Sequence, residues 1–176
     1  PSMKPIVFND PALTESFERD GYVLLPGLDA RTVAELRAEY ASFCPHSVSK
    51  MYSNVHDLPL ETNELIAERL RAVLSPILQD CIQGYDIRGG TFLVKGRGEE
   101  SACQLHQDWN STDETEQLAL VAWIPLCDVD EANGCLVVAP GTHHPEMFPT
   151  VRGANVGDAH FELTDELLEH CIPVPM

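Results

Sequence analysis

The sequence predicts an α+β domain in which helices come first and an antiparallel barrel or sandwich follows. Two observations carry this prediction. Apolar residues recur at helical spacing through residues 10–88. From residue 89 onward, short runs rich in β-branched and aromatic residues alternate with turn residues, which is typical of strands. We therefore expect one domain over residues 3–176, with helices on the outside of a β core at 89–176.

The first predicted helix lies in DPALTESFERDG. Its N-cap is either Asp10 or Thr14, its apolar face carries Leu13 and Phe17 at i, i+4, and Gly21 ends it. The next run, YVLLPG, predicts a short strand that the Pro-Gly pair ends. The chain is thus expected to enter the domain through a helix followed by a strand.

Two more helices are predicted before the β core. The run DARTVAELRAEYASFC has helical spacing of its apolar residues, which are Val33, Leu36, Tyr40 and Phe43. The run ETNELIAERLRAVLSPILQDCIQ is the longest helical pattern, and Pro76 is expected to kink or divide it. Between these two helices, SKMYSNVHDLP is rich in loop residues and predicts a loop.

Strands are expected in GTFLVKG, ACQLHQDW, QLALVAWIPL and GCLVVAP. Asn133-Gly134 predicts a hairpin because both residues tolerate positive φ, and Pro140-Gly141 marks the next turn. The tail predicts a short helix in FELTDELLEH, capped by Thr164, and then another strand in CIPVPM. The second half is therefore expected to be mainly antiparallel sheet.

Composition excludes several classes of function. The formal net charge of −17 disfavours binding to nucleic acid and to anionic membranes. No apolar run is long enough for a signal peptide or a membrane span, so a cytoplasmic location is expected. None of the six cysteines forms a CxxC pair, which favours buried free thiols. Pro1-Ser2 resembles the scar of a cleaved tag and is excluded from fold reasoning.

The triplet His106-Gln107-Asp108 is a candidate half of a metal site. In a strand, residues i and i+2 point to the same face, so His106 and Asp108 would aim at one point. A neutral imidazole and a carboxylate suit a borderline divalent metal such as Fe(II), and one more histidine would complete a facial triad. A chance triplet with a surface His–Asp contact is the alternative.

The residues around this triplet resemble the phytanoyl-CoA dioxygenase family of Fe(II)/2-oxoglutarate oxygenases. The similarity lies in LHQD and then in AWIPLCDVDEANGCLVVAPGTHH, of which NGCLVVAPGTH is the most specific part. The opening FERDGYVLLPGL also resembles the start of family members, so the similarity spans residues 17–144, with a looser fit to the end. The resemblance implies a double-stranded β-helix, a jelly-roll barrel with N-terminal helices packed on it.

The resemblance also implies an activity. His106 and Asp108 would be two of the three iron ligands, and 2-oxoglutarate and O₂ would be cosubstrates, with ascorbate as a candidate reductant. Oxidative decarboxylation of 2-oxoglutarate to succinate and CO₂ would drive hydroxylation of a small or medium organic substrate. Related halogenases have a small residue in place of the carboxylate, so Asp108 disfavours halogenation.

Four residues are candidate contacts of the cosubstrate, by resemblance only. Trp123 matches a tryptophan of the cosubstrate pocket, with core packing as the alternative. Gln107 lies beside the cosubstrate in relatives, although strict alternation points it away from the iron. Thr91 is expected on the strand before the HxD triplet, and Lys50 is a candidate basic contact. His143 and His144, which follow the PGT turn, are expected to be structural or rim residues.

The resemblance places the third ligand, a histidine in an HGS- or HGT-like pattern, beyond Met176, together with an arginine that pairs with 2-oxoglutarate. The C-terminal core strands are therefore expected to be missing from this sequence. Three explanations stay open: a longer natural protein, strands supplied by another chain, or substitution by His160 or His170. The alternative function is a non-catalytic barrel that binds a ligand or partner through an incomplete metal site.

Overall fold

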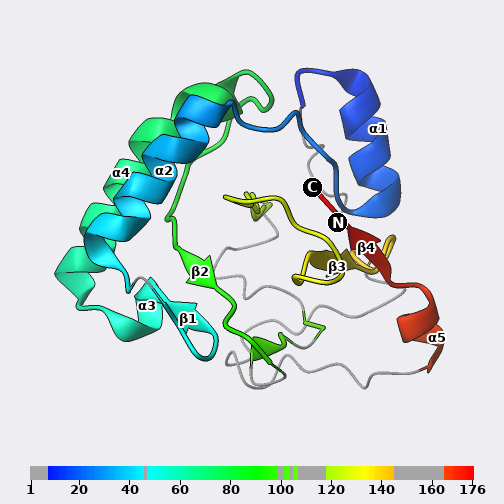
Figure 1. Ribbon diagram of the computed structural model, residues 1–176. Helices are drawn as coiled ribbons and strands as arrows, with labels where there is room; N and C mark the ends of the chain where they lie inside the picture. Colours follow the sequence, from blue (N-terminus) through cyan, green and yellow to red (C-terminus); the bar gives the residue numbers. More distant parts are fainter. Residues whose placement is uncertain (1–7, 46, 99–100, 104, 107–117, 145–164) are drawn as a thin grey trace. The chain divides into compact units, whose positions relative to one another are not determined.

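The computed structural model of the protein describes residues 8–45, 47–98, 101–103, 105–106, 118–144 and 165–176 (Figure 1). The chain groups into two compact units, one of residues 25–103 and one that combines residues 1–24 with 104–176. Helices and short strands occur in both, which confirms the predicted α+β class. The described strands form two two-stranded sheets, so the structure shows no jelly-roll barrel. One oxygenase domain over residues 3–176 stays a prediction.

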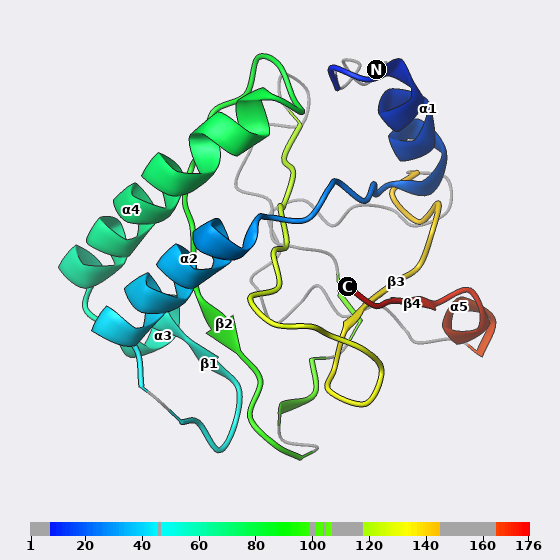
Figure 2. The same ribbon diagram turned by 45° about the horizontal axis from the view of Figure 1, so that its top comes forward.

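Helices α2 (Ala30–Phe43) and α4 (Leu60–Gln79) lie side by side in the 25–103 unit (Figures 1 and 2). Their facing sides bury three aliphatic residues, Leu36, Ile66 and Leu70. Beside this core, the Arg69 guanidinium lies 2.8 Å from the Glu39 carboxylate. The helical spacing of apolar residues thus predicted both helices.

Pro76 does not divide α4, contrary to one of the two predicted outcomes. It lies inside the helix, which continues to Gln79. Proline removes one backbone N–H donor and disturbs the preceding turn, but here only three residues of helix follow it. Its effect is therefore confined to the C-terminal end of α4.

The burial of Ile66 predicts that shortening its side chain lowers the free energy of unfolding. The side chain is 1% exposed, so Ile66→Val removes one methyl group from a close-packed core. We expect the free energy of unfolding to fall by about 1 kcal/mol, measured by urea denaturation. Leu60→Ala, in the first turn of the same helix, removes more carbon from a side chain that is 72% exposed. A larger loss in Leu60→Ala than in Ile66→Val would contradict this assignment of the core.

Helix α2 begins at an aspartate cap. Oδ1 of Asp29 accepts the backbone N–H groups of Arg31 and Thr32, each at 2.9 Å, and Oδ2 accepts the Thr32 hydroxyl at 3.0 Å. These bonds, above all those from Thr32, lower the pKa of Asp29. The carboxylate form is therefore the one that stabilises the start of the helix.

A pH dependence follows from this cap. The folded-state pKa of Asp29 is depressed, so its contribution is present above the unfolded value of about 3.9 and is lost as pH falls through the folded value. We expect Asp29→Ala to lower the melting temperature near pH 7, by an amount that shrinks toward about pH 3. Asp29→Asn keeps a capping oxygen that does not titrate. The difference between the Asn and Ala variants should stay constant over this range; a difference that tracks pH would contradict the assignment.

Strands β1 (Tyr52–Ser53) and β2 (Leu93–Val94) pair antiparallel and form a short two-stranded ribbon. In it, Tyr52 lies opposite Val94. Helix α3 (Asn54–Asp57) follows β1 directly. The predicted loop in SKMYSNVHDLP is therefore wrong over residues 52–57. The partner of β1 lies about forty residues away, and such long-range pairing is not written in local sequence.

Gly96 lets the two sides of this ribbon approach closely. A Cβ atom at Gly96 would lie 2.6 Å from the carbonyl carbon of Ser49 and 2.7 Å from the backbone nitrogen of Lys50. Real Cβ atoms do not come this close to backbone, so only glycine fits here. Lys50 therefore lies opposite Gly96 at one end of the ribbon.

The other unit contains helix α1 (Pro11–Asp20). Asp10 is its N-cap, accepting the Ala12 N–H at 2.9 Å, and Gly21 ends it with a φ of 81°. Both features confirm the prediction, because a left-handed residue after a helix favours glycine. The following residues 22–27 form no strand, so the strand predicted in YVLLPG is wrong.

Strands β3 (Leu136–Val138) and β4 (Ile172–Val174) pair antiparallel in this unit, and helix α5 (Asp165–Glu169) precedes β4 (Figure 1). The strand predictions in GCLVVAP and CIPVPM are confirmed, as is the helix in FELTDELLEH over its described part; its predicted cap, Thr164, lies outside the described residues. Residues 118–126 form no strand, so the strand predicted in QLALVAWIPL is wrong.

The turn before β3 is not the predicted hairpin. Gly134 has a φ of 90°, but Asn133 does not have the positive φ that a type I′ turn requires. Instead, Oδ1 of Asp130 accepts the N–H groups of Ala132 and Asn133 at 2.8 and 3.0 Å. The Asn133 side chain donates to the carbonyl of Asp128 at 2.8 Å. Side-chain hydrogen bonds therefore shape this turn, and β3 pairs with the distant β4.

None of the six cysteines is in a disulfide bond, as predicted, but only Cys44 and Cys135 are buried, and Cys103 and Cys127 are exposed. Among the helices that the structure describes, none is long and apolar enough to cross a membrane.

Candidate metal centre

His106 is the member of the HxD triplet that the structure describes. It is exposed and lies in neither a helix nor a strand. An exposed histidine at this position is not part of the packed core. Gln107 and Asp108 lie outside the described residues. Among the residues that are described, no group of three histidine, cysteine or acidic side chains is placed to hold a metal.

The donor types of the triplet still allow a test of fit. Imidazole nitrogen and carboxylate oxygen are suitable ligands for Fe(II), whereas thiolates would favour softer or structural metals. The exposed cysteines Cys103 and Cys127 are single and lie in no group of ligands among the described residues. By residue type, therefore, His106 and Asp108 fit a mononuclear iron better than a zinc–thiolate site.

Trp123 belongs to the same unit as His106. It is half-buried in a segment without regular secondary structure, where a core strand was predicted. A half-buried indole can line a pocket on one side and pack on the other, so neither the cosubstrate role nor core packing is singled out. Its contact with a cosubstrate stays a prediction.

Thr91 belongs to the 25–103 unit and lies two residues before β2. The residue is exposed, yet its hydroxyl takes part in a hydrogen-bond network with helix α3. Thr91 Oγ1 donates to Asn54 Oδ1 at 2.9 Å and lies 3.4 Å from Ser53 Oγ. The predicted role toward the cosubstrate is untested, but the hydroxyl has an intramolecular partner.

Asn54 is the centre of this network and was missed by the sequence reasoning. It is fully buried, with an exposure of 0%. Its Oδ1 also accepts the backbone N–H of Phe92 at 2.5 Å, and its Nδ2 donates to Asn63 Oδ1 at 2.7 Å. A lone asparagine between serine and valine gives no sequence signal for burial, because asparagine is usually exposed.

Lys50 lies in the same unit as Thr91, at the opposite end of the β1–β2 ribbon. It is exposed, and its backbone faces Gly96, whereas Thr91 lies beside Ser53. Tyr52 is buried between these two positions, and burial raises the pKa of its hydroxyl well above the ordinary value. The phenol therefore stays neutral near pH 7 and is no candidate base.

His143 takes the structural role expected for it. Its Nε2 lies 3.1 Å from the carbonyl oxygen of Glu18, in the last turn of α1, and its ring centroid lies 4.0 Å from that of His144, with the two rings tilted by 40°. The N–H of Gly141 also donates to the carbonyl of Asp20 at 2.9 Å. The PGT turn and its first histidine thus satisfy carbonyl groups at the end of α1.

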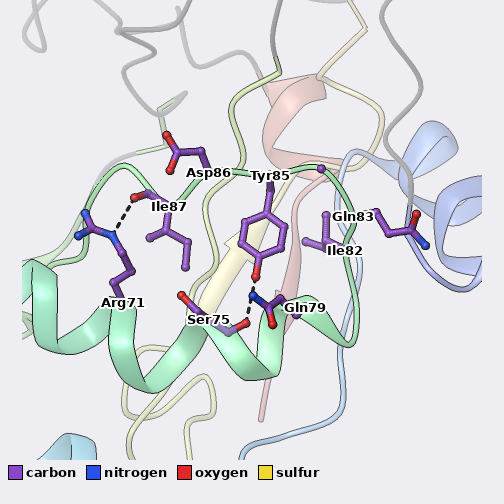
Figure 3. Close-up of a pocket in the computed structure, with 9 residues that line it drawn as sticks. Arg71, Ser75, Gln79, Ile82, Gln83, Tyr85, Asp86 and Ile87 are labelled. Carbon is purple, nitrogen blue, oxygen red and sulfur yellow. Dashed lines mark hydrogen bonds between the residues drawn. The ribbon is translucent and has the colours of Figure 1, made fainter.

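An open groove of about 460 Å³ follows the C-terminal half of α4 (Figure 3). In it, the Tyr85 hydroxyl donates to the carbonyl of Ser75 at 3.0 Å, and Arg71 Nε donates to the carbonyl of Ile87 at 3.1 Å. Both bonds hold the segment after α4 against the helix. None of the four predicted site residues that the structure describes lines this groove, which is formed by Arg71, Ser75, Gln79, Ile82, Gln83, Gly84, Tyr85, Asp86 and Ile87.

Comparison with known families decides the relationship that the motifs suggested. A family model described as phytanoyl-CoA dioxygenase matches residues 17–176, which is most of the chain. The protein belongs to the phytanoyl-CoA dioxygenase family. The matched residues include the HxD triplet, the PGT turn and the three other predicted cosubstrate contacts.

Membership of the phytanoyl-CoA dioxygenase family sets the general class of the protein. The family fold is a cupin-like double-stranded β-helix, and its members are generally oxygenases. A search of curated proteins and a search of solved structures each found no match.

Proposed function

We propose that this protein is an Fe(II)- and 2-oxoglutarate-dependent oxygenase that hydroxylates a small or medium-sized organic substrate. The family match over residues 17–176 carries the proposal, because the His106-Gln107-Asp108 triplet lies inside it. The donor types of the triplet, an imidazole and a carboxylate, support it. The net charge of −17 supports a small-molecule substrate over nucleic acid, and we place the activity in the cytoplasm.

Each site residue has a proposed role. His106 and Asp108 would hold the iron as two of its protein ligands. Bound iron and 2-oxoglutarate together supply the oxidising chemistry, with release of succinate and CO₂. The Asp108 carboxylate takes a coordination position that a halide would need, which favours hydroxylation. Trp123 and Gln107 line the cosubstrate pocket.

Lys50 and Thr91 are proposed contacts of the cosubstrate, on the family resemblance. Lys50 is exposed and carries a flexible ammonium group, which can pair with a carboxylate as a point charge. Thr91 is also exposed, and it lies at the other end of the β1–β2 ribbon from Lys50. The Thr91 hydroxyl donates to Oδ1 of Asn54, which restricts the groups that it can bind.

The proposal is tested by succinate formation. The protein expressed from its complete reading frame is incubated with Fe(II), 2-oxoglutarate, ascorbate and air, in the presence of a panel of small organic substrates. We expect succinate to form only when Fe(II), 2-oxoglutarate and O₂ are all present. Binding of 2-oxoglutarate or of a panel member without any succinate would favour the non-catalytic alternative, and chlorinated products would favour a halogenase.

A further inference from the structure

The hydrogen bonds of helix α3 assign a direction to the Thr91 hydroxyl. We propose that Thr91 offers a ligand lone pairs only, because Asn54 holds its single hydrogen. Groups that bind Thr91 directly are then donors, such as a hydroxyl, an N–H or a water molecule, and a carboxylate of 2-oxoglutarate reaches it through a bridging donor. The part that concerns 2-oxoglutarate rests on the proposed function; the direction of the hydrogen bond does not.

The direction starts at the backbone of Phe92. A backbone N–H can only donate, so the atom of the Asn54 amide that faces it at 2.5 Å must be the oxygen Oδ1. That same Oδ1 lies 2.9 Å from Thr91 Oγ1. An amide oxygen can only accept, so the Thr91 hydroxyl must be the donor in this pair.

The far end of the network agrees with this orientation. With Oδ1 turned to Phe92, Nδ2 of Asn54 faces Oδ1 of Asn63 at 2.7 Å and donates to it. Nδ2 of Asn63 in turn donates to the carbonyl oxygen of Leu58 at 3.0 Å. Carbonyls only accept, so the orientation of Asn63 is assigned independently and matches that of Asn54. Flipping either amide would place like groups face to face.

Two other oxygens lie near the Thr91 hydroxyl, but neither competes on distance. Ser53 Oγ is at 3.4 Å and the carbonyl of Phe92 at 3.5 Å, compared with 2.9 Å for Asn54 Oδ1. Hydrogen bonds of hydroxyl groups are normally shorter than about 3.0 Å. The hydrogen of Thr91 therefore belongs to Asn54, and Asn54 is a positioning residue for this hydroxyl.

The donated hydrogen limits which groups of a ligand can bind the Thr91 hydroxyl. An ionised carboxylate only accepts hydrogen bonds, so it cannot bind a hydroxyl whose hydrogen is already donated. Redirecting that hydrogen would take one of two partners from a fully buried oxygen. One lone pair of Thr91 Oγ1 faces the Ser53 hydroxyl at 3.4 Å, which can donate to it, and the other is left for a donor from a ligand.

The first test reads the hydrogen directly. Exchange of threonine hydroxyl hydrogens in the wild-type protein is measured by NMR from the deuterium isotope shift of Cβ. We expect the Thr91 hydroxyl to exchange about tenfold more slowly than that of Thr32, which bonds to Asp29 at the exposed start of α2. In Asn54→Ala the Thr91 hydroxyl should exchange as fast as that of Thr32. Equally fast exchange of both hydroxyls in the wild type would overturn the proposal, and this measurement stands even where Asn54→Ala does not fold.

The second test uses 2-oxoglutarate as the probe. A direct hydrogen bond to a carboxylate is charge-assisted, and its loss in Thr91→Val would raise the KM for 2-oxoglutarate by about tenfold or more. A bridged contact predicts a rise of only about two- to fivefold, with kcat changed less. Thr62→Val, on α4, controls for loss of a hydroxyl elsewhere in the unit. A tenfold rise specific to Thr91→Val would overturn the acceptor-only assignment.

The two tests separate the two proposals. If the wild-type protein forms no succinate, the proposed function fails, while hydroxyl exchange still decides the direction of the Thr91 bond. If succinate forms and the Thr91 hydroxyl exchanges rapidly, the proposed function stands and the role of Asn54 fails.

Discussion

Replacement of His106 or Asp108 by alanine is expected to abolish succinate formation from 2-oxoglutarate. Each substitution removes a proposed iron ligand, and loss of a residue that merely supports a ligand already costs about 10- to 100-fold in metal affinity or activity. We therefore expect turnover to fall by more than about 100-fold in either variant. The measurement is succinate released per enzyme, at saturating Fe(II) and at limiting Fe(II).

Matched controls make this result specific. His56→Ala removes an exposed imidazole on α3, and Asp128→Ala removes an exposed carboxylate in the turn region before β3. Both variants should keep wild-type turnover. Retained turnover in His106→Ala or Asp108→Ala would remove that residue from the site, and equal losses in the controls would point to general damage of the fold.

Asn54→Ala is expected to cause the largest loss of stability among the substitutions considered. It leaves the buried N–H of Phe92 without its acceptor, deprives Asn63 Oδ1 of a donor and opens a cavity at a position with 0% exposure. A buried unsatisfied group costs about 1–3 kcal/mol, and the cavity adds to this, so we expect about 3–5 kcal/mol. Urea denaturation followed by circular dichroism measures the change.

Substitutions of the residues around Asn54 are expected to lower the free energy of unfolding by progressively smaller amounts. Asn63→Ala removes a half-buried side chain that bonds Asn54 and the Leu58 carbonyl, and should cost about 1–2 kcal/mol. Thr91→Val removes an exposed hydroxyl and should cost about 1 kcal/mol or less. A loss in Asn54→Ala no larger than that in Asn63→Ala would show that the buried amide does not hold α3 against β2.

Helices were predicted well because their signals are local. Asp10 and Gly21 bound α1 through cap interactions that involve residues only two to four positions away. In α2, the apolar spacing selected Leu36, which is buried. Pro76 does not divide α4, because it lies only three residues before the end of the helix.

Strands were predicted less well because a strand exists only through its partner. Val94 pairs with Tyr52 and Leu136 with Val174, and neither partner could be identified from the pattern around one residue. The runs YVLLPG and QLALVAWIPL have the composition of strands, yet residues 22–27 and 118–126 do not pair. Apolar and β-branched content shows that a segment can form a strand. It does not show that another strand is available to pair with it.

The candidate site also has properties that the sequence predicts and properties that depend on the fold. The types and spacing of His106 and Asp108 are properties of the sequence, and so is the family to which residues 17–176 belong. These properties underlie the proposed class of chemistry, because imidazole and carboxylate are ligand types that suit Fe(II).

Tertiary structure alone decided which way the Thr91 hydroxyl points. Asn54 contacts Phe92 and Thr91 only because α3 lies against the start of β2, nearly forty residues later in the chain. A hydrogen bond has a direction that depends on every neighbour of its two atoms, and those neighbours come from distant segments. The sequence by itself thus determined the helices, the family and the metal-binding residue types, whereas the fold determined the burial of Asn54 and the hydrogen-bonding role left to Thr91.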